Sequence, residues 1–404
     1  MSPDPASISH YTRRALAHAQ TLGSSPRGSA TEAERQAAGY VQSELKSLGW
    51  ASSHLEPFTG LRSLWLFLAL AFGLALVGHA AFWLLRQPVG DYSALLISVL
   101  ALGFSGYLVW RKFSFKDYLL RSSLPHAESQ NVVAVIPPAG EVRQQVVLVS
   151  HLDSHRAVFW FASDTLVKVF VVFSYVAMFG IFLAIALYIL AVLTGVQLFA
   201  WLGLILALFH FLSWFTGVTA DLGGYSPGAN DNASGVGTNL ALAERLKSQP
   251  LGNTEVWLAF TGCEETGCDG ILDLLRQHGD ELRQALFIDI EMVGIGDGFR
   301  YTSEEGNLHR QRIPPEVEAL VKEVGEPFGL QAVKAPLVGA FSEGGALWEY
   351  GFKAVCLSGF NQGSPILPEW HRLTDTPSRL QVTSLERAHE LVWALLQRVD
   401  ERPA

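Results

Sequence analysis

Two long blocks of apolar residues dominate the hydrophobic pattern of this chain. A membrane span needs about 20 predominantly apolar residues, and a helix in a soluble core seldom stays apolar on every face over such lengths. A short turn divides each block, with Pro88 in the first and Gly195 in the second, so each block predicts a helical hairpin. The transmembrane hairpins are residues 64–110 and 169–215, with expected spans at 64–85, 92–110, 169–193 and 198–215.

The remaining sequence alternates short apolar runs with helical or turn segments. Residues 1–60, 112–167 and 217–404 together leave about 300 residues, enough for one sizeable α/β domain. We expect a mostly parallel mixed sheet sandwiched between helices, with the two hairpins inserted into it. The strand-length apolar runs are residues 132–136, 146–149, 256–260, 285–290 and 354–357.

Capping patterns predict an amphipathic helix near each end of this domain. Ser29 and Glu32 have the spacing of a capping box, and the helix that follows should stop at Gly49. Thr383 and Glu386 repeat the pattern before the last helix, which should pack on the sheet through one apolar face. That face comprises Leu385, Val392, Leu395 and Val399.

Composition and charge exclude some functions and suggest a location. The 404 residues are 49% hydrophobic and only 17% charged, which indicates a hybrid of membrane and soluble parts. A net charge of -9 argues against a nucleic-acid partner, which needs basic surface. Three cysteines fit a reducing compartment, and the first residues show no secretory signal. The ends of the spans next to the domain carry more basic residues than the hairpin tips, which predicts a cytoplasmic domain in a multi-pass membrane protein. The basic residues near the domain are Arg111, Lys112, Lys116, Arg121, Arg156 and Lys168, whereas the tips carry only Arg86.

Five potential metal ligands occur in separate polar motifs. They are His151 in SHLDSH, Asp231 in GANDNASG, Glu265 in GCEETG, Glu291 in IDIEMVG and His371 in EWHRLTDT. Imidazole nitrogen and carboxylate oxygen suit zinc, and a pair of metals needs one carboxylate that bridges them. Several of these residues sit at or just beyond the ends of predicted strands, where ligands gather in open α/β sheets.

Several motifs in this order resemble the co-catalytic dizinc aminopeptidase family. That family includes bacterial leucyl-type aminopeptidases, glutamate carboxypeptidase II and the glutaminyl cyclases. The similar segments include PRGSATEAERQAAGYVQSELKSLGW, VVLVSHLDS, GANDNASG, FTGCEETG, IDIEMVG and HRLTDTP. The resemblance implies a membrane-anchored zinc exopeptidase, most simply an aminopeptidase acting on peptides, with oligomeric state undetermined.

The resemblance also implies a role for each site residue. His151 and Glu291 would hold one Zn²⁺, Glu265 and His371 would hold the second, and Asp231 would bridge the two. Asp153 would orient His151, and Glu264 would act as the general base.

The chain departs from the family pattern at the position of Glu291, which more often carries Asp, so Asp289 is a rival ligand. Glu343 in FSEGGALWEY is a candidate acid on the substrate side. We interpret His155 and Arg156 as juxtamembrane surface groups, and Cys263 and Cys268 as packing residues.

Three other functions remain as alternatives. An amidohydrolase or a glutaminyl-cyclase-like enzyme could use the same site on a small or lipid-linked amine. A catalytically inactive membrane scaffold could keep the fold without activity. A transporter fits less well, because its ligands should lie inside the spans. Zinc content separates these hypotheses, with about two ions per chain favouring the peptidase, one the cyclase and none the scaffold.

Overall fold

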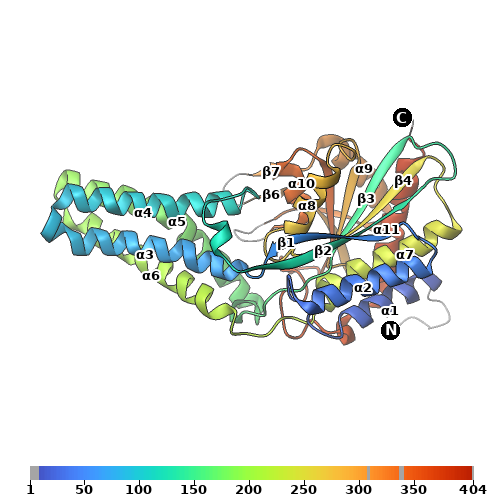
Figure 1. The fold of residues 1–404 in the computed structure, drawn as a ribbon, viewed down its shortest axis with the longest axis horizontal. Coiled ribbons are helices and arrows are strands. Elements are labelled where there is room, and N and C mark those ends of the chain that lie inside the picture. Colours follow the sequence, from blue (N-terminus) through green and yellow to red (C-terminus); the bar gives the residue numbers. More distant parts are fainter. Residues whose placement is uncertain (1–8, 307–309, 336–340, 403–404) are drawn as a thin grey trace.

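The computed structural model describes residues 9–306, 310–335 and 341–402. An α/β domain forms one part of the molecule, and four long helices extend from it as a bundle (Figure 1). The first and last described helices, His10–Leu22 and Val382–Asp400, belong to the domain and not to the bundle (Figure 1). Residues 1–8, which belong to the segment inspected for a secretory signal, lie outside the described residues.

Within the described residues the domain contains one nine-stranded sheet. The order is β1-β2-β4-β3-β5-β9-β6-β7, and β8 pairs with β6. The strands are β1 (His54–Leu61), β2 (His126–Ile136), β3 (Gln144–His151), β4 (Thr254–Thr261), β5 (Leu286–Glu291), β6 (Gly298–Glu305), β7 (Gln311–Arg312), β8 (Gln331–Lys334) and β9 (Lys353–Phe360).

The centre of the sheet is parallel and its flanks are mainly antiparallel. Strands β4, β3, β5 and β9 run in parallel, whereas β2 pairs antiparallel with β4, and β6 antiparallel with β9. The mixed, helix-covered α/β sheet is confirmed, and all five expected runs are strands. Strands β1, β6, β7 and β8 had no matching prediction. Strand β1 carries Pro57 and exposes several of its residues, so its sequence lacks a buried apolar run.

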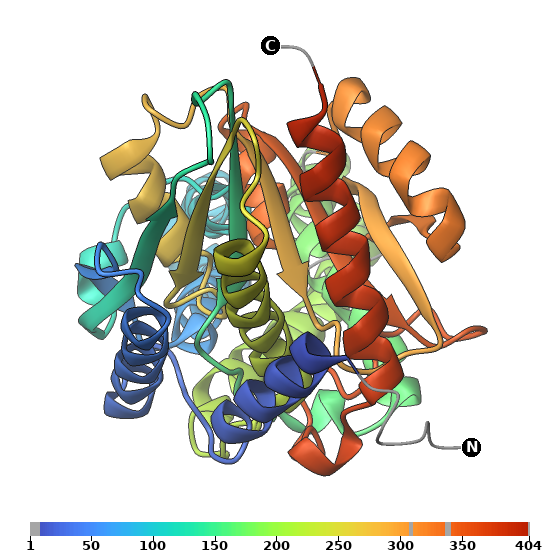
Figure 2. The same ribbon diagram turned by 90° about the vertical axis from the view of Figure 1, so that its right-hand side faces the viewer.

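Helices cover both faces of the sheet. Helices α7 and α11 contact the central strands on one face, with α1 and α2 beside them, and α8 and α10 lie on the other (Figures 1 and 2). The helices of the domain are α1 (His10–Leu22), α2 (Glu32–Ser47), α7 (Ser234–Ser248), α8 (Asp269–His278), α9 (Pro315–Gly325), α10 (Glu343–Glu349) and α11 (Val382–Asp400). Short helical turns are Arg121–Ser123, Phe159–Phe161, Ala229–Ala233, Glu326–Phe328 and Pro377–Arg379.

The helix caps differ from the sequence prediction. Thr31, not Ser29, caps α2, because its hydroxyl accepts a hydrogen bond from the backbone N–H of Glu34. Ser29 is instead buried and donates to a carboxylate of the site described below. Helix α11 begins at Val382, one residue earlier than Thr383, and its expected apolar face is buried as predicted.

The bundle contains α3 (Leu64–Val89), α4 (Asp91–Lys112), α5 (Asp164–Thr194) and α6 (Gln197–Ala220). Each helix contacts two others, in the cyclic order α3, α4, α5, α6. Pro88 lies inside the last turn of α3 and does not break it; the helix ends at Val89 and is capped by Gly90, whose φ is 84°. Helix α5 starts five residues before the expected span, because Ser163 caps it and adds a polar first turn.

The bundle is apolar outside and partly polar inside, the reverse of a soluble protein. Large side chains such as Leu84, Leu100 and Leu193 are more than 60% exposed. Inside, His79 and His210 are buried and hydrogen-bonded to each other at 2.8 Å. All four helices are long and apolar enough to cross a membrane. This polarity is consistent with membrane association, since lipid requires apolar outer faces.

Candidate metal centre

Three adjacent parallel strands bring distant acidic and imidazole groups to one edge of the sheet. His151 is the last residue of β3, and Glu291 is the last residue of β5. Glu264 and Glu265 lie just beyond β4, which ends at Thr261, with two residues between. Strand β3 lies between β4 and β5, so these carboxyl ends meet at one place, as predicted from the motifs.

Two loops complete the cluster from the side. Asp231 lies in the turn Ala229–Ala233 before α7. The backbone N–H groups of Asn230 and Asp231 donate to the buried carboxylate of Asp375, at 2.8 and 3.0 Å, which fixes this turn. His371 lies in the loop after β9, with a φ of 56°. Asp375 therefore ties the loop of His371 to the turn of Asp231.

The two carboxylate oxygens of Asp231 face different imidazoles. Oδ1 lies 3.2 Å from Nε2 of His151, and Oδ2 lies 3.4 Å from Nε2 of His371. Glu291 Oε2 approaches the same nitrogen of His151 at 3.3 Å, and Glu265 Oε2 approaches that of His371 at 3.1 Å. The structure thus gathers the five predicted ligands into two groups that share Asp231. The three acidic side chains and both imidazoles are almost fully buried or border the pocket.

Asp153 supports this cluster from behind. Its carboxylate is fully buried and accepts hydrogen bonds from the hydroxyl of Ser29 at 2.6 Å and from the N–H groups of Glu264 at 3.0 Å and Glu265 at 3.1 Å. Its Oδ1 also lies 3.4 Å from Nδ1 of His151. Burial opposes ionisation, but the His151 ring and these donors hold the pKa of Asp153 below its usual range. A single carboxylate therefore positions three site residues.

The electrostatics of the cluster match the requirements of a bound dication. Burial, followed by neighbouring carboxylates, raises the pKa of Glu264 and of Glu265 well above the usual range. Burial likewise raises the pKa of Glu291 to about 8, against the opposing effect of His151. Among the described residues, no hydrogen-bond partner reaches Oε1 of Glu265. Buried carboxylates in such a group are normally paired or bound to metal, so these residues fit zinc.

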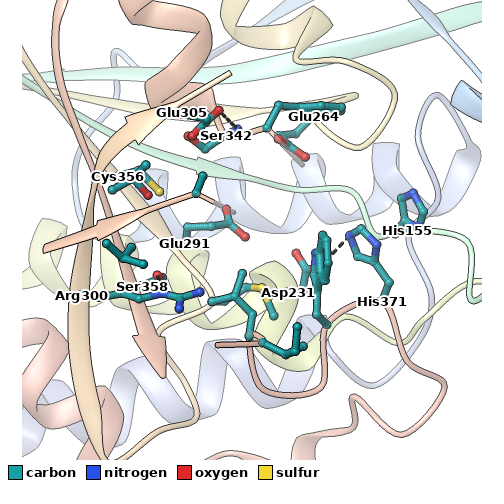
Figure 3. Close-up of a pocket in the computed structure, with 18 of the residues that line it drawn as sticks. His155, Asp231, Glu264, Glu291, Arg300, Glu305, Ser342, Cys356, Ser358 and His371 are labelled. Carbon is teal, nitrogen blue, oxygen red and sulfur yellow. Dashed lines mark hydrogen bonds and ion pairs between the residues drawn. The ribbon is translucent and has the colours of Figure 1, made fainter. Parts of the chain in front are cut away.

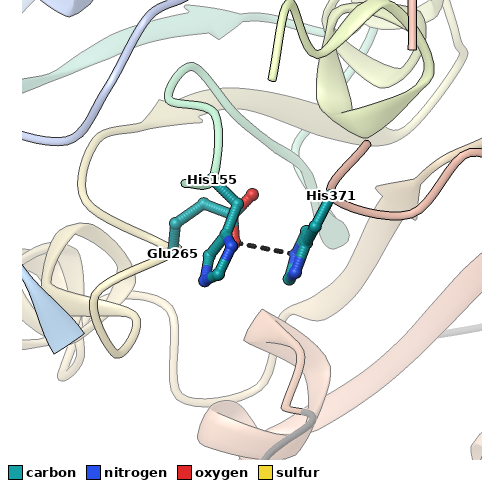
Figure 4. Close-up of side chains that lie close together, drawn as sticks. All are labelled: His155, Glu265 and His371. Atoms are coloured by element: carbon teal, nitrogen blue, oxygen red, sulfur yellow. Dashed lines mark ion pairs between the residues drawn. The ribbon is translucent and has the colours of Figure 1, made fainter. Parts of the chain in front are cut away.

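His155 corrects one sequence interpretation. It is not a surface group: only 6% of it is exposed, and its ring stacks on that of His371 with centroids 3.7 Å apart (Figure 4). Its Nδ1 faces the backbone oxygen of Arg156 at 2.8 Å, and burial lowers the pKa of His155 to about 4. Together with Glu265 and His371 it forms a group that could hold a metal ion. The sequence placed it two residues from a motif aspartate but gave no sign of this stacking.

Asp289 and Glu343, the alternative ligand and the candidate substrate-side acid, lie outside the two groups of proposed ligands. Asp289 is fully buried and accepts a hydrogen bond from the N–H of Gly344 at 3.0 Å, while Glu291 contacts His151. Glu343 begins α10 and is 1% exposed. Burial, then the nearby Asp289 carboxylate, raises its pKa well above the usual range. Cys263, Cys268 and Cys356 are free and buried, in agreement with the packing interpretation of the first two.

A pocket opens beside the cluster and contains a cation that the sequence analysis missed. Its walls include Asp231, Glu264, Glu291 and, on the opposite side, Arg300 from β6 (Figure 3). Arg300 is 8% exposed and donates to Ser358 Oγ at 3.2 Å and to the backbone oxygen of Pro365 at 3.4 Å. Its strand had no apolar signature, so the sequence gave no reason to place this residue at the site.

Solved structures share this fold. The zinc aminopeptidase BSAP of Bacillus subtilis superposes with a TM-score of 0.56 and 14% identity, covering 97% of this chain and 96% of that one. The glutaminyl cyclase of Bacteroides thetaiotaomicron gives a TM-score of 0.55 and 12% identity, covering 96% and 99%. A Zn-dependent exopeptidase of Parabacteroides distasonis gives 0.54 and 13%, covering 97% and 98%. These likenesses show that the chain has the fold shared by these zinc peptidases and glutaminyl cyclases.

Part of the sequence is also similar to a peptidase family. Residues 207–396 match the model of peptidase family M28, which confirms the resemblance to the dizinc aminopeptidase group. The alkaline phosphatase isozyme conversion protein of Escherichia coli (strain K12) is 38% identical over 89 residues. That match spans 21% of this chain and a quarter of the relative's length. The chain is thus similar to peptidase family M28 over residues 207–396.

Proposed function

We propose that this protein is a membrane-anchored zinc exopeptidase that removes residues from the amino end of peptides. The observation that carries the proposal is Asp231, whose two oxygens face His151 and His371 on opposite sides. A carboxylate in that position suits a bridge between two metal ions. His151 and Glu291 would hold one zinc ion, and Glu265 and His371 the other. Bound zinc would supply an activated water and polarise the scissile carbonyl.

Glu264 is the proposed general base. It lines the pocket, and its backbone is held by Asp153, next to the proposed ligand Glu265. A carboxylate in this position can take a proton from water and pass it to the leaving amine. The pocket also contains Glu305, which is neither a proposed zinc ligand nor the proposed base. Its carboxylate is therefore left to pair with the positively charged amino end of a peptide.

Anchoring in the bilayer follows from the bundle, and its orientation from flanking charges. The ends of α4 and α5 next to the domain carry Arg111, Lys112 and Lys168, whereas the hairpin tips carry Arg86, paired with Asp91 at 2.8 Å. By the positive-inside rule the domain faces the cytoplasm. Protease digestion of sealed, oriented vesicles checks this, and a domain protected inside right-side-out cells but cleaved in inverted vesicles is the expected result.

Metal analysis and one substitution test the enzymatic proposal. We expect about two zinc ions per chain and hydrolysis of peptides with a free amino end. Glu264→Gln should keep both ions while kcat falls by about 10²–10⁴-fold, because the base is lost but the ligands remain. Glu316→Gln, an exposed glutamate in α9, is the matched control. Undiminished hydrolysis by Glu264→Gln would contradict the assigned role, and one zinc ion per chain would favour the glutaminyl-cyclase class instead.

A further inference from the structure

An apolar cavity inside the helical bundle lies next to the active-site pocket. It shares three wall residues with the active-site pocket, namely Leu64, His155 and His371. From there it is lined by Leu68 and Phe72 of α3 and by residues of α5 and α6. Its volume is about 60 Å³, several times the roughly 10–15 Å³ that one water needs by the same measure. The active-site pocket and the cavity in the bundle are thus adjacent and share part of one wall.

The walls of this cavity suit hydrocarbon rather than peptide. None of its lining residues in the described part of the chain is Asp, Glu, Lys or Arg, and most are aromatic or aliphatic. Thr216, one of its few hydroxyl groups, already accepts a hydrogen bond from Trp160 Nε1 at 3.3 Å. A charged or polar group placed here would lose its hydration without gaining partners. An apolar chain would gain contact area and release water.

The shape of the cavity indicates a chain that enters lengthwise. On α3 the lining runs from Leu64 to Phe72, which is about 12 Å of helix rise. On α5 it runs from Phe170 to Met178. The apolar outer faces of the same helices adjoin the lipid in the proposed anchoring. The polar head of such a substrate would lie in the active-site pocket, which contains Arg300, Ser342 and Ser358.

We propose that the substrate is an amide bearing a long linear hydrocarbon chain, which the bundle cavity holds while the scissile bond lies at the metal centre. The inference rests on the proposed function and names its substrate class. In the reaction the C–N bond breaks and the water oxygen bonds to the carbonyl carbon. One water proton passes through Glu264 to the leaving nitrogen, and the second then moves from the new carboxylic acid to the amine, giving a carboxylate and an ammonium group. The chain can belong either to the acyl group or to the side chain of an amino-terminal residue.

A chain-length series on the wild-type protein in phosphatidylcholine vesicles is the first test. One arm uses N-acyl amino acids with butanoyl, octanoyl and tetradecanoyl groups. The other uses dipeptides with a free amino end whose first residue carries n-alkyl side chains of matched length. We expect kcat/KM to rise in one arm by up to about fourfold per methylene until the cavity is full, and then to level off. The responding arm identifies which side of the amide carries the chain.

Cavity-filling variants separate binding in the bundle from simple partition into lipid. Ala177→Phe and Ser174→Phe on α5 put a ring into the cavity, while Val172→Phe places the same ring on the outer face, where Val172 is 63% exposed. We expect the first two to lower the ratio of long-chain to short-chain kcat/KM at least tenfold, and Val172→Phe to leave it unchanged.

The outcomes are distinguishable from a failure of the proposed function. Hydrolysis of short peptides, with no gain from chain length in either arm, would overturn the inference and leave the exopeptidase proposal standing. A long-chain preference that persists in both cavity-filling variants would also overturn the inference and leave the exopeptidase proposal standing. Absence of zinc and of any amide hydrolysis would overturn both proposals. If the cavity-filling proteins fail to fold, the plateau in the wild-type series still decides the question.

Discussion

Replacing Asp153 by asparagine should damage the site without touching a proposed metal ligand. The carboxylate accepts hydrogen bonds from Ser29, Glu264 and Glu265 and lies 3.4 Å from Nδ1 of His151. An asparagine of the same shape has one acceptor oxygen and one NH₂ group. The NH₂ group cannot accept, so at least one of these donors, and in one orientation two, must lose its partner.

The magnitude follows from the number of bonds lost. A hydrogen bond to a charged group contributes roughly 1.5–3 kcal/mol, so the folded protein should lose on the order of 2–6 kcal/mol. For a domain of this size that corresponds to a fall in Tm of at least about 4 °C. Zinc affinity should fall by about 10–100-fold, because His151 and the Glu264–Glu265 segment are no longer held in place.

Thermal unfolding and competition with a chromophoric zinc chelator measure both effects on detergent-solubilised protein. Asp280→Asn removes an exposed carboxylate and is the matched control, for which we expect neither effect. If Asp153→Asn kept the wild-type Tm and zinc affinity, the idea that one buried carboxylate positions three site residues would be wrong.

Three further predictions concern the metal, a buried histidine and the stacked imidazole. Chelation should abolish hydrolysis and lower Tm, and added zinc should restore both; activity that persists in metal-free protein would exclude the zinc mechanism. Burial lowers the pKa of His18 to about 4 in the folded protein. Between about pH 6.5 and 4 the unfolded chain therefore binds one more proton than the folded protein at this histidine. As the pH is lowered through that range, the free energy of unfolding should decrease by up to roughly 3 kcal/mol. His18→Gln should show a flatter dependence of Tm on pH over that range, and an unchanged slope would refute the assignment. His155→Phe should retain two zinc ions because it keeps the ring on His371, whereas loss of one ion would show that His155 is itself a ligand.

Local sequence was sufficient to predict the site residues that sit at strand ends. Buried parallel strands are continuous apolar runs, so the positions of His151 and Glu291 at the end of such runs could be recognised directly. The four long apolar helices could also be predicted from the sequence, because a helix that faces lipid is apolar over its whole length. Helix ends were less accurate, since a polar first turn such as that of α5 carries no hydrophobic signal.

The sequence by itself determined the chemical types at the site, the strands that present them and the existence of two hairpins. Only the tertiary structure decided that Asp231 lies between two imidazoles, that His155 stacks on His371, and that Arg300 faces them. It also decided that the bundle cavity lies next to the active-site pocket. The physical reason is the separation in sequence of the residues involved. Hydrophobic periodicity and helix capping depend on residues only a few positions apart. These contacts instead join segments far apart in the chain, whose meeting depends on how the whole sheet and bundle pack.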